Sequence, residues 1–434
     1  MAGRLSKQLR FGDLLHCLQT SFTRITDLRD TERVFYSLSD IFTSAFAMFF
    51  LQDSSLLAFQ RRIENKSGQN NMRTVFGVEN IPSDTQLRDT IDDHENTEIA
   101  GIFKEFLTRL QRSGQLKNYK YLNESYLVAL DGSDYFSSDK VKCDKCLTKR
   151  TSDGIHYHHQ ILQSTIIHPD MKQVIPLAPE FIRNEDGTDK QDCEQNAGKR
   201  LIDRVKSDHP RLPLVWVGDG LYSKAPFIRK IKDNGYSFIL VAKPKDHKYL
   251  YSEIDALRKI NETETTSSPG LTKNSTFHYE WINNLPINGQ SDAPIVNTVL
   301  FYITKNGKKT MRNTWVTDIL ITKENVAEIV RGGRSRCKIE NESFNTLKNQ
   351  GYHLEHNFGH GKHNLSETFF MLNLLAFFFH QIFELASPEY RQARAEFSSK
   401  MEYWNCIRSM FRLFIISDWQ HLLLRINSPP KEVV

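Results

Sequence analysis

SYLVALDG (residues 125–132) and LPLVWVGDG (residues 212–220) are the two stretches of sequence that decide the fold. Each is a short apolar run that ends in an aspartate followed by glycine, at Asp131 and Asp219. Short apolar runs bounded by turn residues are typical of strands buried inside a sheet. Ligand and metal sites of open α/β sheets form at the carboxyl ends of such strands. The two stretches therefore predict an α/β sheet with a pair of carboxylates at one edge.

The segments between and after these strands continue the alternation of strands and helices. Residues 156–169 and 173–182 have the pattern of strands, residues 190–208 that of a long helix, and residues 224–243 that of a helix followed by a strand. This alternation favours an α/β fold. Three strands before the first long helix is the order of an RNase H-like mixed sheet flanked by helices, and this is the fold class that we expect.

The sequence on either side of this region has a different pattern. Residues 11–110 carry apolar residues at three- and four-residue spacing, which predicts helices. Residues 262–314 combine a polar linker with β-rich runs, and Asn306-Gly307 within them is a hairpin turn signal. We expect the next helix to begin near Asn325 and to break at the glycine pair 332–333, before a second helix over residues 334–350.

These patterns predict five parts along the chain. They are a helical domain over residues 1–120, the first part of an RNase H-like catalytic domain over 121–261, a β-rich insertion over 262–314, the rest of the catalytic domain with its last helix over 315–385, and a C-terminal helical region over 386–434. A small helical domain ahead of a catalytic domain suits DNA binding, and docking to another protein fits it equally well.

The composition is that of a globular protein from a reducing compartment. The formal net charge of +5 over 434 residues does not decide for or against nucleic acid, because acidic and basic surfaces average out. Six cysteines are too few for a disulfide framework. The first residues lack the apolar segment of a signal peptide. The apolar run from Phe369 to Phe379 is too short to span a bilayer. We expect a cytoplasmic protein with no membrane partner.

A third carboxylate, Glu340, lies on the predicted helix over residues 334–350. Arg336, Glu340, Phe344 and Lys348 recur every four residues and share one stripe of that helix. Ion pairing on an exposed helix surface produces the same spacing. The position of this helix after a buried strand, and its apolar content, favour a place in the active site. Glu342, two residues away, is an alternative third carboxylate.

At these residues the chain resembles the DDE transposases of bacterial insertion sequences, of the broad IS4-like group. The helix is similar to that group's Y-x2-R-x3-E-x6-K signature, in which Arg336 and Glu340 match the R-x3-E part. Gly333 stands at the tyrosine position, and Lys348 falls one residue late. The run NQGYHLEHNFGHGKHN (residues 349–364) also resembles the group. The resemblance covers about residues 120–385.

The resemblance implies a DNA transposase whose Asp-Asp-Glu triad is Asp131, Asp219 and Glu340. Such a triad holds two Mg²⁺ (or Mn²⁺) ions about 3.5–4 Å apart, which activate a water or a DNA 3′-OH and stabilise the departing 3′ oxygen. Asp131 would bridge both ions, while Arg336 and Lys348 would contact phosphates. The expected partners are double-stranded terminal inverted repeats and target DNA. A homodimer is expected because two DNA ends must be brought together.

Two other functions fit the same residues. One is a two-metal nuclease of the same fold that hydrolyses DNA without strand transfer. The other is a DNA-binding derivative that has lost catalysis.

A second group of residues has the spacing of a zinc site. Cys143 and Cys146 form a CxxC, and His156, His158 and His159 follow on a predicted strand. Structural zinc takes four cysteine and histidine ligands, and the candidates are the two cysteines with His156 and His158. Cys193 could also reach such a site. A reduced, metal-free turn with histidines on a strand is the alternative.

Three further residues are candidates for DNA contact. The resemblance suggests that an aromatic residue of the β-rich insertion stacks on a flipped base, and Trp281 is the candidate; filling a small β core is the alternative. His356 and His360 lie in the glycine-containing run after the Glu340 helix, where they could contact DNA.

Overall fold

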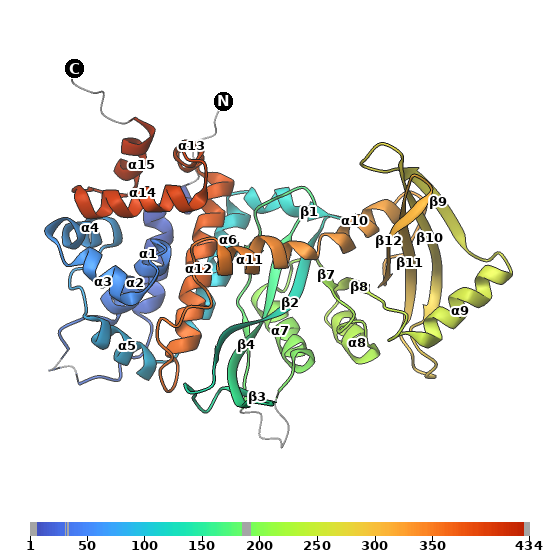
Figure 1. Cartoon of the computed structure of the whole chain (residues 1–434), viewed down its shortest axis with the longest axis horizontal. Helices are drawn as coiled ribbons and strands as arrows, with labels where there is room; N and C mark the ends of the chain where they lie inside the picture. Colours follow the sequence, from blue (N-terminus) through green and yellow to red (C-terminus); the bar gives the residue numbers. More distant parts are fainter. Residues whose placement is uncertain (1–6, 31, 33, 185–191, 429–434) are drawn as a thin grey trace.

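A mixed sheet runs through the middle of the protein and contains the five strands of an RNase H-like fold (Figure 1). The computed structural model describes residues 7–30, 32, 34–184 and 192–428. The central strand β2 (Ser125–Ser138) pairs antiparallel with β4 (Gly154–Ile167) and parallel with β7 (Leu214–Gly218). Strand β8 (Ser237–Val241) continues the sheet parallel to β7. On the other side, β6 (Glu180–Ile182) pairs antiparallel with β4.

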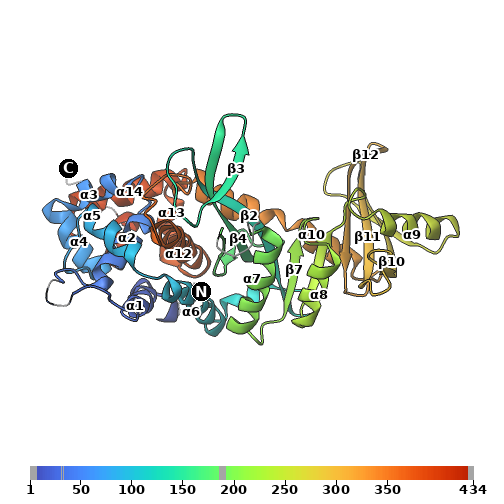
Figure 2. The same cartoon turned by 90° about the horizontal axis from the view of Figure 1, so that it is seen from below.

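The resulting order, β6-β4-β2-β7-β8, confirms the predicted fold class. Strand β7 is buried at all five positions, as its uninterrupted apolar run predicts. The helices α7 (Glu194–Asp208) and α8 (Ala225–Asp233) lie side by side along the sheet (Figure 2). The first residues of the helix predicted over 190–208 lie outside the described residues. Two short strands, β3 (Leu147–Thr151) and β5 (Ile175–Pro176), occupy the remaining outer edge of β4.

The β-rich insertion is a continuation of this sheet. It consists of β9 (Glu264–Pro269), β10 (Ser275–Pro286), β11 (Ile295–Lys305) and β12 (Lys308–Thr317), with α9 (Lys248–Lys259) packed on β10. Asn306 and Gly307 have φ angles of 49° and 79°, so the predicted hairpin turn is confirmed. Strand β12 pairs with β11 along its length, and from Trp315 its other edge also pairs with β8. The predicted boundary between insertion and catalytic domain, at residues 314 and 315, therefore falls inside one continuous strand.

The N-terminal and C-terminal segments pack together in one helical body. The N-terminal helices are α1 (Phe11–Phe22), α2 (Leu38–Phe50), α3 (Leu56–Ile63), α4 (Lys66–Phe76), α5 (Asp84–Asp93) and α6 (Thr97–Arg112). The C-terminal helices are α13 (Pro388–Ala395), α14 (Lys400–Leu413) and α15 (Trp419–Asn427). The Asn71 amide of α4 donates to the carbonyls of Phe411 and Phe414, at 2.8 and 2.7 Å, and accepts from the Ile416 N–H. The two ends of the chain are thus joined by buried hydrogen bonds.

Helix α12 (Leu365–Ala386) is the core around which this helical body is built. It is long and apolar enough to cross a membrane, but 89% of its most apolar window is buried inside the protein. Phe379 packs edge-on against Phe50 of α2, with the ring centroids 5.6 Å apart. A helix that is apolar all round is a core helix when it is buried in this way.

The helix that carries Glu340 differs from its prediction at the glycine pair. Helix α10 (Val326–Arg334) runs through Gly332 and Gly333, so the predicted break there is wrong. A turn follows at Ser335 and Arg336, and the chain then continues as a π-helix, η4 (Ile339–Phe344), and as α11 (Asn345–Asn349). A Cβ atom on Gly333 would lie 2.6 Å from the Trp315 indole nitrogen. The glycine is therefore explained by close helix–sheet packing rather than by chain reversal.

Replacing Gly333 by alanine should destabilise the protein. The added methyl group overpacks a buried contact with Trp315, and overpacking costs about 1–3 kcal/mol. Gly101→Ala is the matched control, because Gly101 lies in α6 with nothing within 4 Å of its added Cβ. Alanine there should raise the free energy of unfolding by up to about 1 kcal/mol. Denaturant unfolding of both variants measures the difference, and an unchanged midpoint for Gly333→Ala would contradict the packing argument.

Candidate active site

Three carboxylates from distant parts of the chain converge just beyond the point where the parallel pairing of β2 with β7 ends. The Arg336 guanidinium lies between two of them, 3.8 Å from the Asp131 carboxylate and in an ion pair with Glu340. Burial raises the pKa of Asp131 to about 7; Arg336 opposes this shift, while the nearby carboxylates of Glu340 and Asp219 add to it. The structure therefore brings together the three acidic residues that the sequence predicted.

Asp131 does not end its strand, in contrast to the prediction. Strand β2 continues to Ser138, because its partner β4 is equally long. The parallel pairing with β7, however, ends at Ala129 and Val217, two residues before Asp131 and Asp219 respectively. Both carboxylates therefore lie just beyond the shared edge of the parallel pair. The Asp219 carboxylate also accepts the backbone N–H of Leu221 at 2.8 Å, which orients its side chain.

A fourth carboxylate, Glu194, lies in the same place and was not predicted. It lies in the first turn of α7, where it accepts hydrogen bonds from the Tyr222 hydroxyl and the Gln160 amide, both at 3.0 Å. Burial raises its pKa, and the Asp219 carboxylate adds to the shift. A Cβ atom on Gly132 would lie 2.5 Å from a Glu194 carboxylate oxygen. The glycine after Asp131 was the sequence signal for this close approach.

Glu340 and Glu342 have different surroundings. Glu340 is ion-paired with Arg336 and contributes to the raised pKa of Asp131. Within the described part of the chain, the Glu342 side chain has no hydrogen bond or ion pair, and its charge is not among the main causes of the raised pKa of Asp131. This difference favours Glu340 as the third acidic residue. Lys348, the predicted basic helper, is ion-paired with Glu355 at 2.8 Å.

The three residues predicted to contact DNA, Trp281, His356 and His360, differ in their exposure. Trp281 is 1% exposed inside the insertion, so its face is not available to a base and the alternative of a small β core holds. His356 is exposed. His360 is 7% exposed, because its ring packs against Phe136 with the centroids 4.4 Å apart, so it is not presented to DNA.

The predicted zinc residues are only partly brought together. Cys143 and Cys146 lie close to each other, but the histidines beside them are His159 and His360. His156 and His158 lie instead against the carboxylates of Asp139 and Asp134, at 2.6 and 3.2 Å, respectively. The reason is strand alternation: residues 156 and 158 share one face of β4, and residue 159 points to the other. The exposed Cys193 does not belong to this cluster.

A family model described as "Transposase DDE domain" matches residues 144–378, more than half of the chain. The matched range contains Asp219, Glu340 and Cys146. It starts at residue 144, after Asp131 and Cys143. No curated protein matches the chain.

Replacing Asp131 by asparagine should stabilise the protein in the absence of divalent metal. The pKa of this carboxyl is about 7 in the folded protein, above the value of about 4 in an unfolded chain. Its ionisation therefore opposes folding, and this effect grows as the pH rises from about 4 to about 7 and is constant above that range. The difference in melting temperature between Asp131→Asn and wild type, measured in EDTA, should widen from pH 5 to 7 and then level off.

Asp134→Asn serves as the control, since Asp134 is an exposed carboxylate on the same strand. Its melting temperature should follow that of the wild-type protein across this pH range. A pH-independent difference for Asp131→Asn would contradict the idea that burial and the neighbouring carboxylates disfavour the charged form of Asp131.

Proposed function

Because the chain belongs to the family of transposase DDE domains, we propose that it cuts the ends of a DNA element and joins the freed 3′-OH ends to target DNA. The observation that carries the proposal is the convergence of Asp131, Asp219 and Glu340 at the edge of an RNase H-like sheet. The three residues come from three separate elements, β2, the turn after β7, and η4.

The donor set fits a pair of hard divalent cations. Carboxylate oxygens are the ligands that Mg²⁺ and Mn²⁺ take in proteins. Burial and the neighbouring carboxylates raise the pKa of Asp131, and Arg336 is the cation beside it, so further positive charge would be stabilised here. Bound Mg²⁺ or Mn²⁺ ions would activate the attacking hydroxyl and stabilise the leaving 3′ oxygen.

Within this site each side chain has a separate task. The charges of both Glu340 and Asp219 raise the pKa of Asp131. As the resemblance implies, Asp131 would be shared by both ions, while Asp219 and Glu340 would each hold one. The Glu194 carboxylate packs against Gly132, the residue after Asp131, and would hold this part of β2 in place. Arg336 is 20% exposed and its guanidinium can donate two parallel hydrogen bonds to a phosphate of the bound DNA. Lys348 would provide a second positive charge after leaving Glu355.

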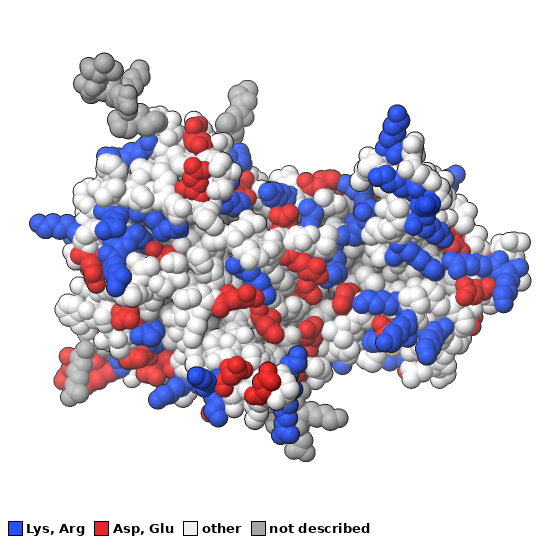
Figure 3. Space-filling model, viewed as in Figure 1, with Lys and Arg blue, Asp and Glu red and all other residues white. Residues whose placement is uncertain are grey.

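Basic side chains gather over the end of the protein that carries the insertion, while acidic ones lie over its centre (Figure 3). The exposed residues of the β11–β12 hairpin include Lys305, Lys308, Lys309 and Arg312. Such a cluster is suited to the phosphate backbone of DNA. We assign the hairpin to DNA binding, and the helical body to binding the element ends in a homodimer. All six cysteines are free, which fits action in a reducing cytoplasm.

Three single substitutions test the assignment of the triad. Asp131→Asn, Asp219→Asn and Glu340→Gln should each lower metal-dependent cleavage of the element's own terminal repeats by more than about a hundredfold, comparable to the loss of a transition-state-stabilising group. Binding of the same DNA, measured by fluorescence anisotropy, should be retained. Glu342→Gln is the matched control for Glu340→Gln and should cleave like the wild type.

Product analysis separates the proposed reaction from its alternatives. Strand transfer predicts that labelled 3′ ends become covalently joined to a target plasmid. Hydrolysis products alone would indicate a nuclease of the same fold. Full activity in any triad variant would remove that residue from the triad, and specific end binding by an uncleaving wild-type protein would indicate a DNA-binding derivative.

The basic hairpin gives an independent prediction on DNA affinity. The triple variant Lys305→Ala, Lys308→Ala, Arg312→Ala should bind DNA more weakly. In a plot of the logarithm of its DNA affinity against the logarithm of the salt concentration, the slope should be shallower by about 0.9 for each phosphate that the hairpin no longer neutralises. Arg211→Ala, Lys232→Ala is the control, because both residues are exposed and belong neither to the hairpin nor to the helical body. An unchanged salt slope in the triple variant would exclude the hairpin from the DNA interface.

A further inference from the structure

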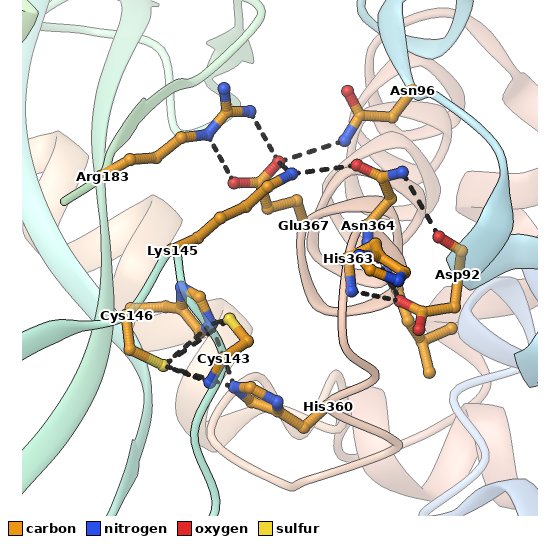
Figure 4. A network of polar contacts seen from close by, with 12 residues as sticks. Asp92, Asn96, Cys143, Lys145, Cys146, Arg183, His360, His363, Asn364 and Glu367 are labelled. Carbon is orange, nitrogen blue, oxygen red and sulfur yellow. Dashed lines mark hydrogen bonds and ion pairs between the residues drawn. The ribbon is translucent and has the colours of Figure 1, made fainter. Parts of the chain in front are cut away.

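Four ligand atoms from two distant parts of the chain meet beside the sheet, away from the carboxylates. Cys143 and Cys146 lie in the connection between β2 and β3, His159 on β4, and His360 in the run before α12 (Figure 4 labels the cysteines and His360). Their sulfur and ring-nitrogen atoms all lie within 4.8 Å of one another. Cys146, His159 and His360 are 2, 3 and 7% exposed, respectively.

We propose that these four residues form a closed structural zinc site. A tetrahedral zinc ion with Zn–S bonds of about 2.3 Å and Zn–N bonds of about 2.0–2.1 Å needs ligand separations of about 3.8 Å between sulfurs, about 3.5 Å between sulfur and nitrogen, and about 3.3 Å between nitrogens.

The observed separations follow this tetrahedron along five of its six edges, and the sixth pair of atoms, Cys143 Sγ and His360 Nε2, lies within 4.8 Å. The two Sγ atoms are 3.8 Å apart. The distances from Cys143 Sγ and Cys146 Sγ to His159 Nε2, and from Cys146 Sγ to His360 Nε2, are each 3.5 Å. The two Nε2 atoms are 3.1 Å apart. Ordinary packing of side chains gives no reason for five distances to agree with one coordination polyhedron.

The hydrogen bonds that orient the four ligand residues are also typical of a metal site. The other ring nitrogen of His360, Nδ1, donates to the Gly361 carbonyl at 2.9 Å, which leaves the Nε2 lone pair directed at the cysteines. The Cys143 N–H donates to Cys146 Sγ at 3.4 Å, and the Cys146 N–H donates to the Cys143 carbonyl at 3.2 Å. These bonds close the CxxC into a turn that directs both sulfurs to one point.

The chemistry of the donors selects zinc over the alternatives. Two thiolates and two imidazoles are soft and borderline ligands that suit Zn²⁺, whereas Mg²⁺ takes oxygen ligands. A disulfide would require the sulfurs to be about 2.05 Å apart and would leave both imidazoles directed at it without a role. Four protein ligands fill a tetrahedral zinc ion, so no position is open for catalysis.

The zinc site would join the chain segment that carries Asp131 to the one that carries Glu340. The cysteines follow β2, which carries Asp131, and His360 follows Glu340 by twenty residues along the chain. Neighbouring contacts join the same segments: Lys145 donates to Asn364 at 2.9 Å, and Arg183 is paired with Glu367 of α12 (Figure 4). Asp92 of α5 accepts the backbone N–H groups of residues 362–365. Zinc would thus lock a junction of sheet, helical body and α12.

Metal analysis of the full-length protein tests the site. Protein purified without chelators should contain one zinc per chain, and replacement by Co²⁺ should give the intense visible absorption and sulfur-to-metal charge-transfer bands of a tetrahedral thiolate site. Cys146→Ser and His360→Asn should lose the bound zinc. His156→Asn and His158→Asn are the matched controls and should retain it, because their rings face Asp139 and Asp134.

The result does not depend on catalysis, since Asp131→Asn should keep its full zinc content. If a ligand variant fails to fold, the Co²⁺ spectrum of the wild-type protein still decides the question. An octahedral Co²⁺ spectrum, full zinc retention in folded Cys146→Ser, or a Cys143–Cys146 disulfide in the freshly purified protein would each overturn the proposal.

Discussion

The arrangement of the whole chain depends on the need to cover α12, a helix that is apolar on every face. Helices from both ends of the sequence and the short strand β5 pack against it, because a helix of this kind cannot leave a side to water. Its few polar residues then fix its orientation. Asn373 donates to the Tyr352 carbonyl at 2.9 Å, and Gln381 accepts the Val174 N–H at 3.0 Å. The helical body and the catalytic sheet are therefore parts of one folding unit.

The electrostatics of the acidic edge follow from this rigid frame. The sheet holds Asp131 and Asp219 near each other, α7 adds Glu194, and the π-helix adds Glu340. One guanidinium, that of Arg336, faces this group. Burial raises the pKa of a carboxyl group and like charges held beside it raise that pKa further, as Asp131 illustrates. The sheet, α7 and the π-helix thus hold several carboxylates close together, and this fixed group of acidic side chains is what a cation site requires.

Features encoded in local pattern could be predicted from the sequence. The apolar runs before Asp131 and Asp219 located the two central strands, and Asn306-Gly307 located the hairpin. Features that depend on contacts between distant residues could not. Nothing near Gly333 reveals that Trp315 lies against it, and nothing near Cys143 reveals His360, which is more than 200 residues away. The choice between base stacking and a place in a β core could not be made for Trp281 for the same reason, since burial is a property of the assembled sheet.

The π-helix η4 accounts for a difference in spacing that the sequence left unexplained. The signature of the group that the chain resembles has six residues between its glutamate and lysine, whereas seven separate Glu340 from Lys348. A π-helix bonds each residue to the fifth along rather than the fourth, so it accommodates one extra residue per turn. An insertion can therefore be absorbed inside this turn while the flanking helix keeps its phase. If η4 holds such an insertion, residues after Phe344 correspond to positions one earlier in the signature, so Lys348 would take the place of its lysine.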